Sequence, residues 1–530
     1  MKYIDFAKVK VFLFYLLLIL ITYGLSNAFN NLDFDLWSRL IQGKHVIQTG
    51  SVMYKDILSF TPTHTWYDPE WLSSAFLYLV INKFGLISIT ILKFVLIALS
   101  IIFVTVGVHY TYNYKYSKLH LEYFVLILAL LFLGGTSGMF LRCQLFTYVF
   151  IPILISLLEL ISKNYDTKKS LPYLISIPFL MLLWLNTHGG CIAGVGILVL
   201  YVIGRILNKK PVKKFLYIFL STFLVFFINP WGCKYIQFLL HSATLDRSWI
   251  IEWHSIIGHN LFSKKEVVIL LILTMALYLF VLILKRFKNI NYSKMLILLV
   301  TYYLGWMHYK HIPIYAICAG IYLYNDYIFL FQKIFSYIYK KANFDEISKE
   351  YLLLTKDILV YIFVFAISFY FILTSPISKS LNKATIRTFP MSVVEFIKEN
   401  NIKGNLFAPY FFSSYISYKT YPNIKIFIDG RQEQVWDYEI FDRVMFFMYK
   451  MESSKPIVEE YEPDLYMLEN GWLYELYIEK SPKYKLIYND GKYRLYIKKN
   501  LAKNYYKLIN INYEYAMDTI LDTDIDFKKK

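Results

Sequence analysis

Long apolar runs separated by short polar segments dominate the chain as far as Leu373. The first, 11–25, is either a signal peptide ending at a small-residue cluster or an uncleaved span, which we favour because so many runs follow. The other runs are 86–109, 121–133, 145–161, 171–185, 191–206, 215–228, 267–284, 295–306, 312–329 and 358–373. Since a spanning helix needs about 20 residues, the shorter runs must include flanking residues. The pattern predicts about eleven transmembrane helices.

Basic residues occupy every second loop between these runs, for example 209–214 and 285–294. Cytoplasmic loops are enriched in Lys and Arg, so the alternation predicts a cytoplasmic amino terminus and an extracytoplasmic position for everything after Leu373. Lys264-Lys265 is the one basic pair on the other side. The alternation also requires that Trp71–Phe84, which is apolar but short, lies at the membrane interface or re-enters it.

The pattern changes from about Thr388, where short apolar runs of strand type alternate with amphipathic helical stretches. The run 424–428 is rich in isoleucine and predicts a buried strand, with Asp429-Gly430-Arg431 turning the chain at its end. Arg431 then either meets a glycan or the membrane domain, or pairs with Asp429 to fix the turn. We therefore expect an α-helical polytopic membrane domain over 1–380, containing a first external loop at 27–85. A small extracytoplasmic α/β domain over 385–500 and a loosely held tail over 501–530 follow it.

Composition supports a membrane protein and excludes other classes. Hydrophobic residues make up 57% of the chain and charged residues only 18%, and the net charge of +18 is explained by the basic loops. No basic stretch belongs to a nucleic-acid-binding module, so we expect no nucleic acid partner. The four cysteines lie singly in or near apolar runs, which fits neither a disulfide framework nor a zinc site.

The first external loop begins with an acidic motif, Asn31-Leu32-Asp33-Phe34-Asp35-Leu36-Trp37. If a helix starts here, both aspartates lie in its first turn, and Phe34 and Trp37 anchor it at headgroup level. A helix cap with an aromatic anchor is the structural alternative to a catalytic pair. Residues two apart do not share a helix face, so we expect Asp35 to cap the helix or pair with Arg39, leaving Asp33 as the preferred general base.

Further polar residues collect at the predicted external ends of the helices. Each taken alone has a structural explanation as a turn, a helix end or an interfacial anchor. Together, their one-sided clustering suits an anionic lipid head group and a sugar, with cations for phosphate and aromatic faces for the ring. The candidate binding residues are Arg142, Gln144, Asn186, His188, Glu252, His254, Lys310 and His311.

The stretches DFDLWSRLIQGKHVIQTG, WYDPEWLSSAFLYL, WLNTHGG, NPWG, IIEWHS and FIDGR extend over nearly the whole chain. With the aspartate pair in the first external loop, they resemble the GT-C class of membrane glycosyltransferases, in particular a bacterial subgroup mostly without assigned substrates. The subgroup often has Arg-Pro-Gln where this chain has Arg142-Cys143-Gln144.

The resemblance implies an inverting transferase in the inner or plasma membrane. It would move a sugar from a polyprenyl-phosphate donor to a glycan, lipid or protein acceptor, with Asp33 or Asp35 as base. The resemblance does not point to any one cofactor. A divalent metal is possible, because two carboxylates can ligate one, but lysine and arginine can replace it. Two other classes stay open: a flippase or transporter for lipid-linked glycans, and a non-enzymatic scaffold for an envelope complex.

Overall fold

The computed structural model describes residues 6–28, 32–135, 140–256, 265–342, 345–374, 389–449, 457–471, 475–505 and 520–528. Its contacts divide the chain into two units. The helical unit comprises Met1–Asn30, Thr90–Cys233 and Asp246–Ser380. The sheet unit comprises Asn31–Ile89, Lys234–Leu245 and Leu381–Lys530. We describe each unit by itself.

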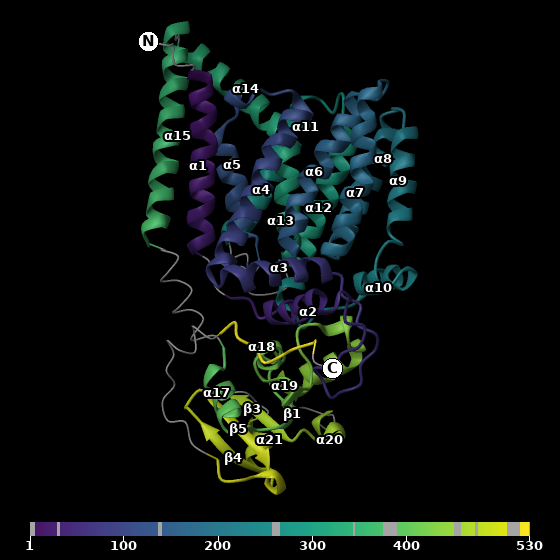
Figure 1. Ribbon diagram of the computed structural model, residues 1–530. Helices are drawn as coiled ribbons and strands as arrows, with labels where there is room; N and C mark the ends of the chain where they lie inside the picture. Colours follow the sequence, from purple (N-terminus) through teal and green to yellow (C-terminus); the bar gives the residue numbers. More distant parts are fainter. Residues whose placement is uncertain are drawn as a thin grey trace. The chain divides into compact units, whose positions relative to one another are not determined.

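Most of each predicted apolar run is helical, and the run 312–329 is divided between two helices (Figure 1). The helices are α1 (Phe6–Ala28), α4 (Ile87–Tyr112), α5 (Leu121–Leu133), α6 (Gln144–Lys163), α7 (Leu171–Thr187), α8 (Cys191–Leu207), α9 (Lys213–Val225), α11 (Lys265–Leu284), α12 (Tyr292–Met307), α13 (Ile312–Tyr322), α14 (Tyr324–Ala342) and α15 (Glu346–Thr374). Among the described residues, six helices are long and apolar enough to cross a membrane, or seven if a bent pair counts as one span. The chain is therefore a multi-pass membrane protein, and the number of eleven spans stays a prediction.

The bent pair corrects the predicted run 312–329. The chain breaks after Tyr322, and α13 and α14 meet at an angle of 57°. α14, the second half of this run, has an aspartate in its first turn. Asp326 is buried and forms ion pairs with Lys294 and Lys285. A buried carboxylate needs such partners. These ion pairs therefore favour a direction of α14 that differs from the axis of α13.

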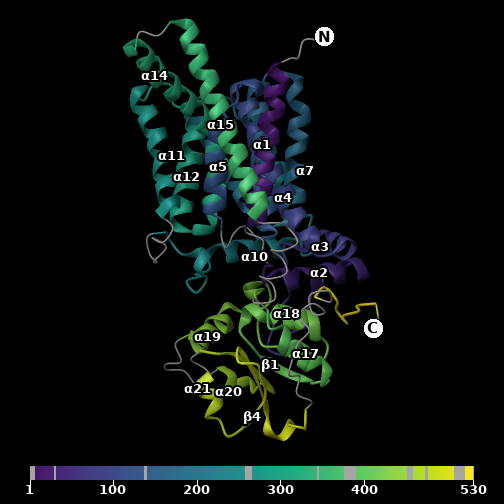
Figure 2. The same ribbon diagram turned by 90° about the vertical axis from the view of Figure 1, so that its left-hand side faces the viewer.

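The first and last helices of the helical unit pack along each other. Figures 1 and 2 show α1 beside α15, and these two helices form one of the most extensive helix contacts in the chain. Lys10 of α1 donates to Asp357 of α15 at 2.5 Å, and Lys356 pairs with Glu122 of α5 at 2.7 Å. Further along the chain, α12 packs on α8 and α13, and α7 on α6 and α9.

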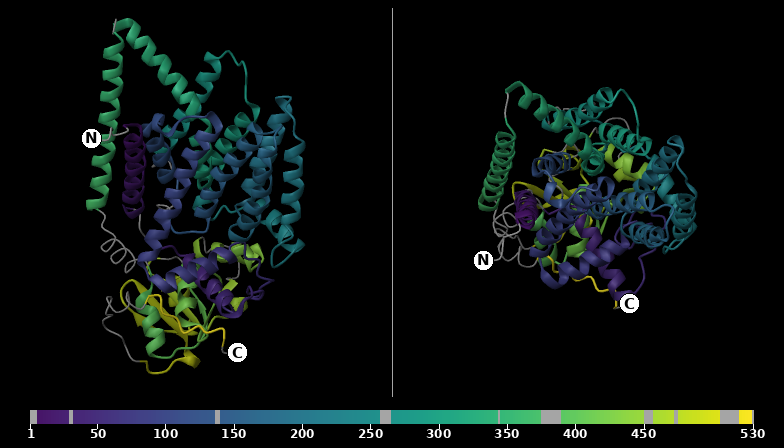
Figure 3. Two further views of the ribbon diagram at one scale, coloured as in Figure 1. Left: turned by 45° about the horizontal axis from the view of Figure 1, so that its top comes forward. Right: turned by 90° about the horizontal axis from the view of Figure 1, so that it is seen from above.

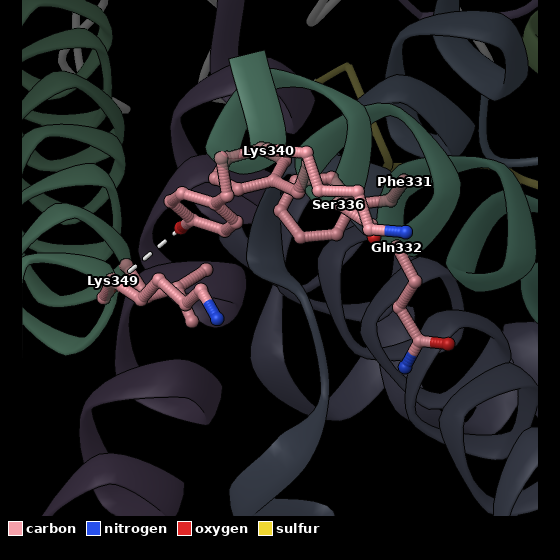
Figure 4. A pocket seen from close by; sticks show the side chains of 8 residues that line it. Phe331, Gln332, Ser336, Lys340 and Lys349 are labelled. Carbon is pink, nitrogen blue, oxygen red and sulfur yellow. Dashed lines mark hydrogen bonds between the residues drawn. The ribbon is translucent and has the colours of Figure 1, made fainter. Parts of the chain in front are cut away.

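An open cavity of about 680 Å³ lies between α14 and α15. Figure 3 shows these two helices meeting at one end of the helical unit, and Figure 4 shows Phe331 and Lys340 of α14 and Lys349 of α15 lining the cavity. None of the residues predicted to bind substrate lines it. It adjoins the loop that the charge pattern assigns to the cytoplasm.

The sheet unit contains a five-stranded mixed sheet of order β2-β1-β3-β5-β4, which confirms a small α/β fold at the carboxyl end. The strands are β1 (Gly404–Phe407), β2 (Ile424–Ile426), β3 (Leu465–Glu469), β4 (Tyr484–Asn489) and β5 (Tyr493–Lys498). β1 pairs in parallel with β2 and β3, whereas β5 pairs antiparallel with β3 and β4. The helices are α17 (Met391–Glu399), α18 (Tyr410–Thr420), α19 (Tyr438–Tyr449), α20 (Ile457–Tyr461) and α21 (Glu475–Glu479).

The first external loop belongs to this unit, although the predicted boundaries placed 27–85 in the membrane domain. Ser59 forms a parallel bridge with Ile426, so the loop continues the sheet beyond β2. The amide of Phe60 donates to the carbonyl of Ile426 at 3.1 Å. An edge strand presents unpaired backbone groups, and here the loop satisfies them.

The loop also contributes α2 (Leu36–Thr49) and α3 (Trp71–Phe84), which pack on each other, and α2 packs on α18. The bounds of α3 are those that the pattern predicted, and Gly85 ends it with a φ of 70°. The connection between α9 and α11 contributes α10 (Cys233–Thr244).

Part of the predicted tail is held in place. Tyr418 of α18 donates to the carbonyl of Leu521 at 2.5 Å, and the amide of Phe527 donates to Gln48 of α2 at 3.0 Å. Ile520 and Ile525 are buried. Apolar burial thus fixes residues 520–528, contrary to the expectation of a loose tail.

Candidate functional site

The acidic motif lies immediately before α2 rather than in its first turn. α2 begins at Leu36 and Asp35 occupies the N-cap position, but its side chain makes no cap hydrogen bond. Asp33 is 2% exposed and Asp35 is half-buried. The expectation that Asp35 caps the helix is therefore wrong.

Arg39 has partners that local spacing does not reveal. Its Nη1 contacts Asp68 at 2.6 Å and Glu70 at 3.0 Å, and its Nη2 donates to Gln434 at 3.2 Å. Two carboxylates from outside α2 already balance its charge. Local spacing alone therefore does not decide which carboxylates pair with Arg39, and Asp33 as the base stays a prediction.

The aromatic residues of the motif pack inside the sheet unit. Phe34 makes edge contacts with Phe389, Phe411 and Phe412. Trp37 is fully buried and contacts Phe389. The motif is thus fixed by an aromatic core, and the predicted anchoring of these two rings at headgroup level is wrong.

The turn after β2 approaches the acidic motif. A Cβ atom added at Gly430 would lie 2.5 Å from Oδ1 of Asp35. The φ angle of Gly430 is outside the left-handed region, so the glycine is needed here for space and not for backbone conformation. The backbone of the FIDGR stretch therefore forms one wall beside the Asp35 carboxylate.

Arg431 is fully buried and fixes this turn. Its Nε donates to both carboxylate oxygens of Asp429 at 2.8 and 3.0 Å, and its Nη1 to Asp56 at 2.6 Å. The guanidinium also lies over the rings of Trp66 and Trp436. Burial alone would lower the pKa of Arg431, but Asp429 and Asp56 outweigh it and raise the pKa above its ordinary value. Of the two interpretations from sequence, turn fixing describes Arg431.

A second cluster forms in the helical unit around Trp253, the last residue of the short helix η4 (Ile251–Trp253). Lys310 lies 3.6 Å and Arg247 4.4 Å from the centre of the indole ring. Arg142 forms an ion pair with Glu252 at 2.6 Å, with side chains 20% and 23% exposed. We call Arg142, Arg247, Glu252, Trp253 and Lys310 the Trp253 cluster.

Two predicted histidines border this cluster. The ring of His311 is 5.7 Å from that of Trp253, and His254 lies next to Trp253 with its ring bonded to the carbonyl of Ser248. The amide of Tyr309 donates to the carbonyl of His254 at 3.1 Å, which ties the two segments together. The structure thus gathers Arg142, Glu252, His254, Lys310 and His311.

The remaining predicted residues have local contacts. His188 Nδ1 accepts from the amide of Gly190 and is bonded to Thr147 at 2.7 Å, and Asn186 donates to the carbonyls of Leu182 and Ile228. Gln144 is the half-buried first residue of α6. These contacts match the structural explanation of each as a helix-end residue. All eight predicted binding residues lie in the helical unit, and both aspartates in the sheet unit.

Two buried cations were not among the candidate binding residues. Arg247 is 6% exposed and stacks on Trp253, and Lys93 of α4 is 1% exposed inside a candidate span. The signal for Lys93 was present, because a lysine inside an apolar run is costly and marks a functional position by default. For Arg247 the stacking partner six residues away in an irregular loop gave no periodic signal.

Neither cluster supplies a recognisable metal centre. Within the part of the chain that the structure describes, no group of three or more His, Cys, Asp or Glu side chains is arranged to hold a metal ion.

Comparison with known proteins gives a result for structure but not for sequence. No family model and no curated protein sequence matches the chain. The archaeal oligosaccharyltransferase AglB from Archaeoglobus fulgidus, solved with an inhibitory peptide and a dolichol-phosphate, is similar with a TM-score of 0.60 and 9% identity over 88% of this chain and 69% of AglB. ArnT from Cupriavidus metallidurans, bound to undecaprenyl phosphate, is similar with a TM-score of 0.52 and 11% identity over 92% of this chain and 98% of ArnT.

Both proteins are polytopic membrane glycosyltransferases of the GT-C class. The matches extend over both units of this chain, since each covers more than four fifths of it. At these identities the likeness concerns the fold, and it confirms the resemblance stated from sequence at that level: the chain has the GT-C fold.

Proposed function

We propose that this protein is a membrane glycosyltransferase that moves a sugar from a polyprenyl-phosphate donor to an extracytoplasmic acceptor. The observation that carries the proposal is the GT-C fold combined with a cluster of cations on one aromatic ring. Of the two similar structures, one was solved with dolichol-phosphate and the other with undecaprenyl phosphate. A lipid phosphate is thus a ligand class compatible with this fold.

The Trp253 cluster suits a phosphate group. Arg142, Arg247 and Lys310 carry three positive charges and Glu252 one negative charge, so the cluster has a formal charge of +2. Trp253 holds Arg247 and Lys310 over its ring. The Arg142–Glu252 ion pair is partly exposed, so a phosphate can compete with Glu252 for Arg142.

We assign the general base to Asp35, with Asp33 as the second candidate. Asp35 is half-buried and more exposed than Asp33, and a base must reach the acceptor. Asp35 removes the proton of an acceptor hydroxyl, and that oxygen bonds to the anomeric carbon of the donor. The bond from this carbon to the phosphate oxygen breaks, and the polyprenyl phosphate leaves as an anion. A single displacement of this kind inverts the anomeric configuration.

Phosphate is charged when it leaves, so this scheme needs no strong general acid. Cations that bind the donor phosphate can balance the leaving group, and no step is routed through a metal ion. Full transfer after treatment with a chelator is the expected result.

The orientation in the membrane is part of the proposal. The amino terminus is cytoplasmic and the carboxyl-terminal domain extracytoplasmic, in the inner or plasma membrane, as the basic loops indicate. A topology reporter fused after Ser380 tests this arrangement. A cytoplasmic signal from that fusion would overturn it.

The decisive test compares lipid-linked sugars in a deletion strain with and without complementation. The wild-type gene should prevent accumulation of a polyprenyl-phosphate sugar, and Asp35→Asn should fail to do so at normal protein level. Loss of a general base lowers transfer by roughly 10²–10⁴-fold. Asp524→Asn, a change at a carboxylate whose side chain is 76% exposed, is the matched control.

Two results contradict the proposal. Full complementation by both Asp33→Asn and Asp35→Asn would remove the acidic motif from the chemistry. Accumulation of the donor only in the cytoplasmic leaflet of the deletion strain would identify a flippase instead.

A further inference from the structure

We propose that Gly430 is a positioning residue that sets the orientation of the Asp35 carboxylate. This inference rests on the proposed function, in which Asp35 is the base. It connects two stretches that the sequence analysis treated separately: the acidic motif of the first external loop and the FIDGR turn after β2. Both belong to the sheet unit.

Asp35 is the residue that a side chain at position 430 would meet. An added Cβ would lie 2.5 Å from Oδ1 of Asp35 and 3.6 Å from its Cγ, and no other atom is nearer than 4 Å. Real Cβ atoms essentially never approach another heavy atom so closely, so a side chain at position 430 must displace something. The carboxylate is the group in its way.

The turn that carries Gly430 has little freedom to withdraw. Arg431 joins Asp429 to Asp56, and the backbone amide of Arg431 also donates to Asp429 at 3.0 Å. All three side chains are fully buried. The carbonyl of Arg431 accepts from the amide of Gln434 at 2.9 Å. Moving this turn would break a buried ionic network, which is costly.

The backbone of the acidic motif is held as firmly. The fully buried Trp37 follows Asp35 by two residues, and Ser38 Oγ donates to the carbonyl of Asp35 at 2.9 Å. The buried Leu32 and Leu36 flank the motif. With both backbones fixed, the cheapest response to a larger residue 430 is rotation of the Asp35 side chain.

Rotation of a carboxylate costs little in stability but much in catalysis. A reacting group misplaced by about 1 Å can lose roughly 10²-fold in rate. Gly430 therefore leaves the space that Asp35 needs for its working rotamer, and the buried Arg431 network exists to hold that space open. This gives the FIDGR turn a role in transfer without any contact with substrate.

Gly430→Ala tests the inference. We expect kcat to fall about 10- to 100-fold, the KM for the lipid donor to stay unchanged, and the thermal unfolding midpoint to match the wild type. In an Asp35→Asn background the same change should have no further effect, because it acts through Asp35. Gly196→Ala in α8, where an added Cβ meets no atom within 4 Å, is the control.

Three outcomes overturn the inference: full activity of Gly430→Ala, a lower unfolding midpoint that accounts for the loss, or an equal loss in the Asp35→Asn background. Failure of the proposed function looks different. If Asp35→Asn retains full transfer, the assigned base is wrong; if Asp35→Asn is inactive and Gly430→Ala is active, only the positioning role is wrong.

Discussion

Two arginines of this chain are surrounded in opposite ways. Arg431 in the sheet unit is fully buried, holds two fully buried aspartates and lies between two tryptophans. Arg142 in the helical unit is about one fifth exposed, pairs with Glu252 and lies near the ring of Phe140. The first arginine is held by buried carboxylates, whereas the second lies where an incoming anion can reach it.

The difference separates structural from functional charge. A buried charge whose hydrogen bonds go to fixed carboxylates makes a unique turn and is costly to disrupt. A half-buried pair contributes little to stability, because solvent screens it and its side chains lose freedom. The sequence pattern singled out both arginines, and only their surroundings tell them apart. The following predictions test that distinction, from the largest expected effect to the smallest.

Arg431→Met should destabilise the protein by about 3–5 kcal/mol, because Asp56 and Asp429 would remain buried without their cation. Folded yield and thermal unfolding in detergent measure the effect. Arg443→Met, in an ion pair with side chains 36% and 51% exposed, is the control and should change stability by less than about 1 kcal/mol. Adding Asp56→Asn and Asp429→Asn to Arg431→Met should recover part of the loss; no recovery would argue against the ionic explanation.

Arg142→Gln should lower transfer without lowering stability. A hydrogen bond to a charged group contributes about 1.5–3 kcal/mol, so kcat/KM should fall about 10- to 150-fold. Arg494→Gln, at an arginine 27% exposed and paired with Glu475, is the matched control and should transfer normally. The swap of Arg142→Glu with Glu252→Arg restores an ion pair. Normal activity in the swapped protein would show that only the pair matters, contrary to a phosphate-binding role.

Trp253→Leu should raise the KM for the lipid donor at least about 5-fold, since each cation–π contact contributes about 0.5–1 kcal/mol or more and two are lost. Donor titration at fixed acceptor measures this. The control is Tyr165→Leu, because Tyr165 also faces two cations, Arg205 at 5.3 Å and Lys214 at 5.2 Å, but next to a loop assigned to the cytoplasm. An equal change in both variants would mean that the aromatic contacts are structural.

Lys419 provides the smallest test, because burial, aided by Lys398, lowers its pKa to about 8 despite nearby carboxylates. The unfolded lysine keeps its proton to about pH 10.4, so above pH 8 the unfolded state binds more protons and stability rises with pH. We expect a gain of about 1 kcal/mol between pH 7 and 9. Lys419→Met should abolish it, whereas the exposed Lys403→Met should not. A gain that persists in Lys419→Met would assign it to another group.

The apolar pattern revealed most of the helices and the position of β2, because burial in lipid or in a sheet core acts on contiguous residues. The pattern also predicted the bounds of α3, because Gly85 follows the apolar run and ends the helix. The pattern did not reveal which unit the first loop joins, since that depends on backbone bonds between Ser59 and Ile426.

Errors in the candidate site had the same origin. The i, i+4 rule assigned Arg39 to Asp35, but long-range partners, Asp68 and Gln434, compete with local ones. Arg431 was correctly placed at a turn, yet its second carboxylate, Asp56, lies 375 residues away. The sequence pattern shows which residues are polar and where helices end. It does not show the long-range ion-pair partners that determine whether a charged residue is structural or functional.

The joining of the first loop to the sheet has a consequence for biosynthesis. Thr61 donates to the carbonyl of Phe427, and the two residues are 366 positions apart. At about 5–20 residues per second, the loop would be made roughly 20–70 s before the strand that it completes. During that interval its strand-forming edge has no native partner. The nascent chain therefore depends on protection of this segment, and a truncated product would expose an unpaired strand edge that can bind other chains.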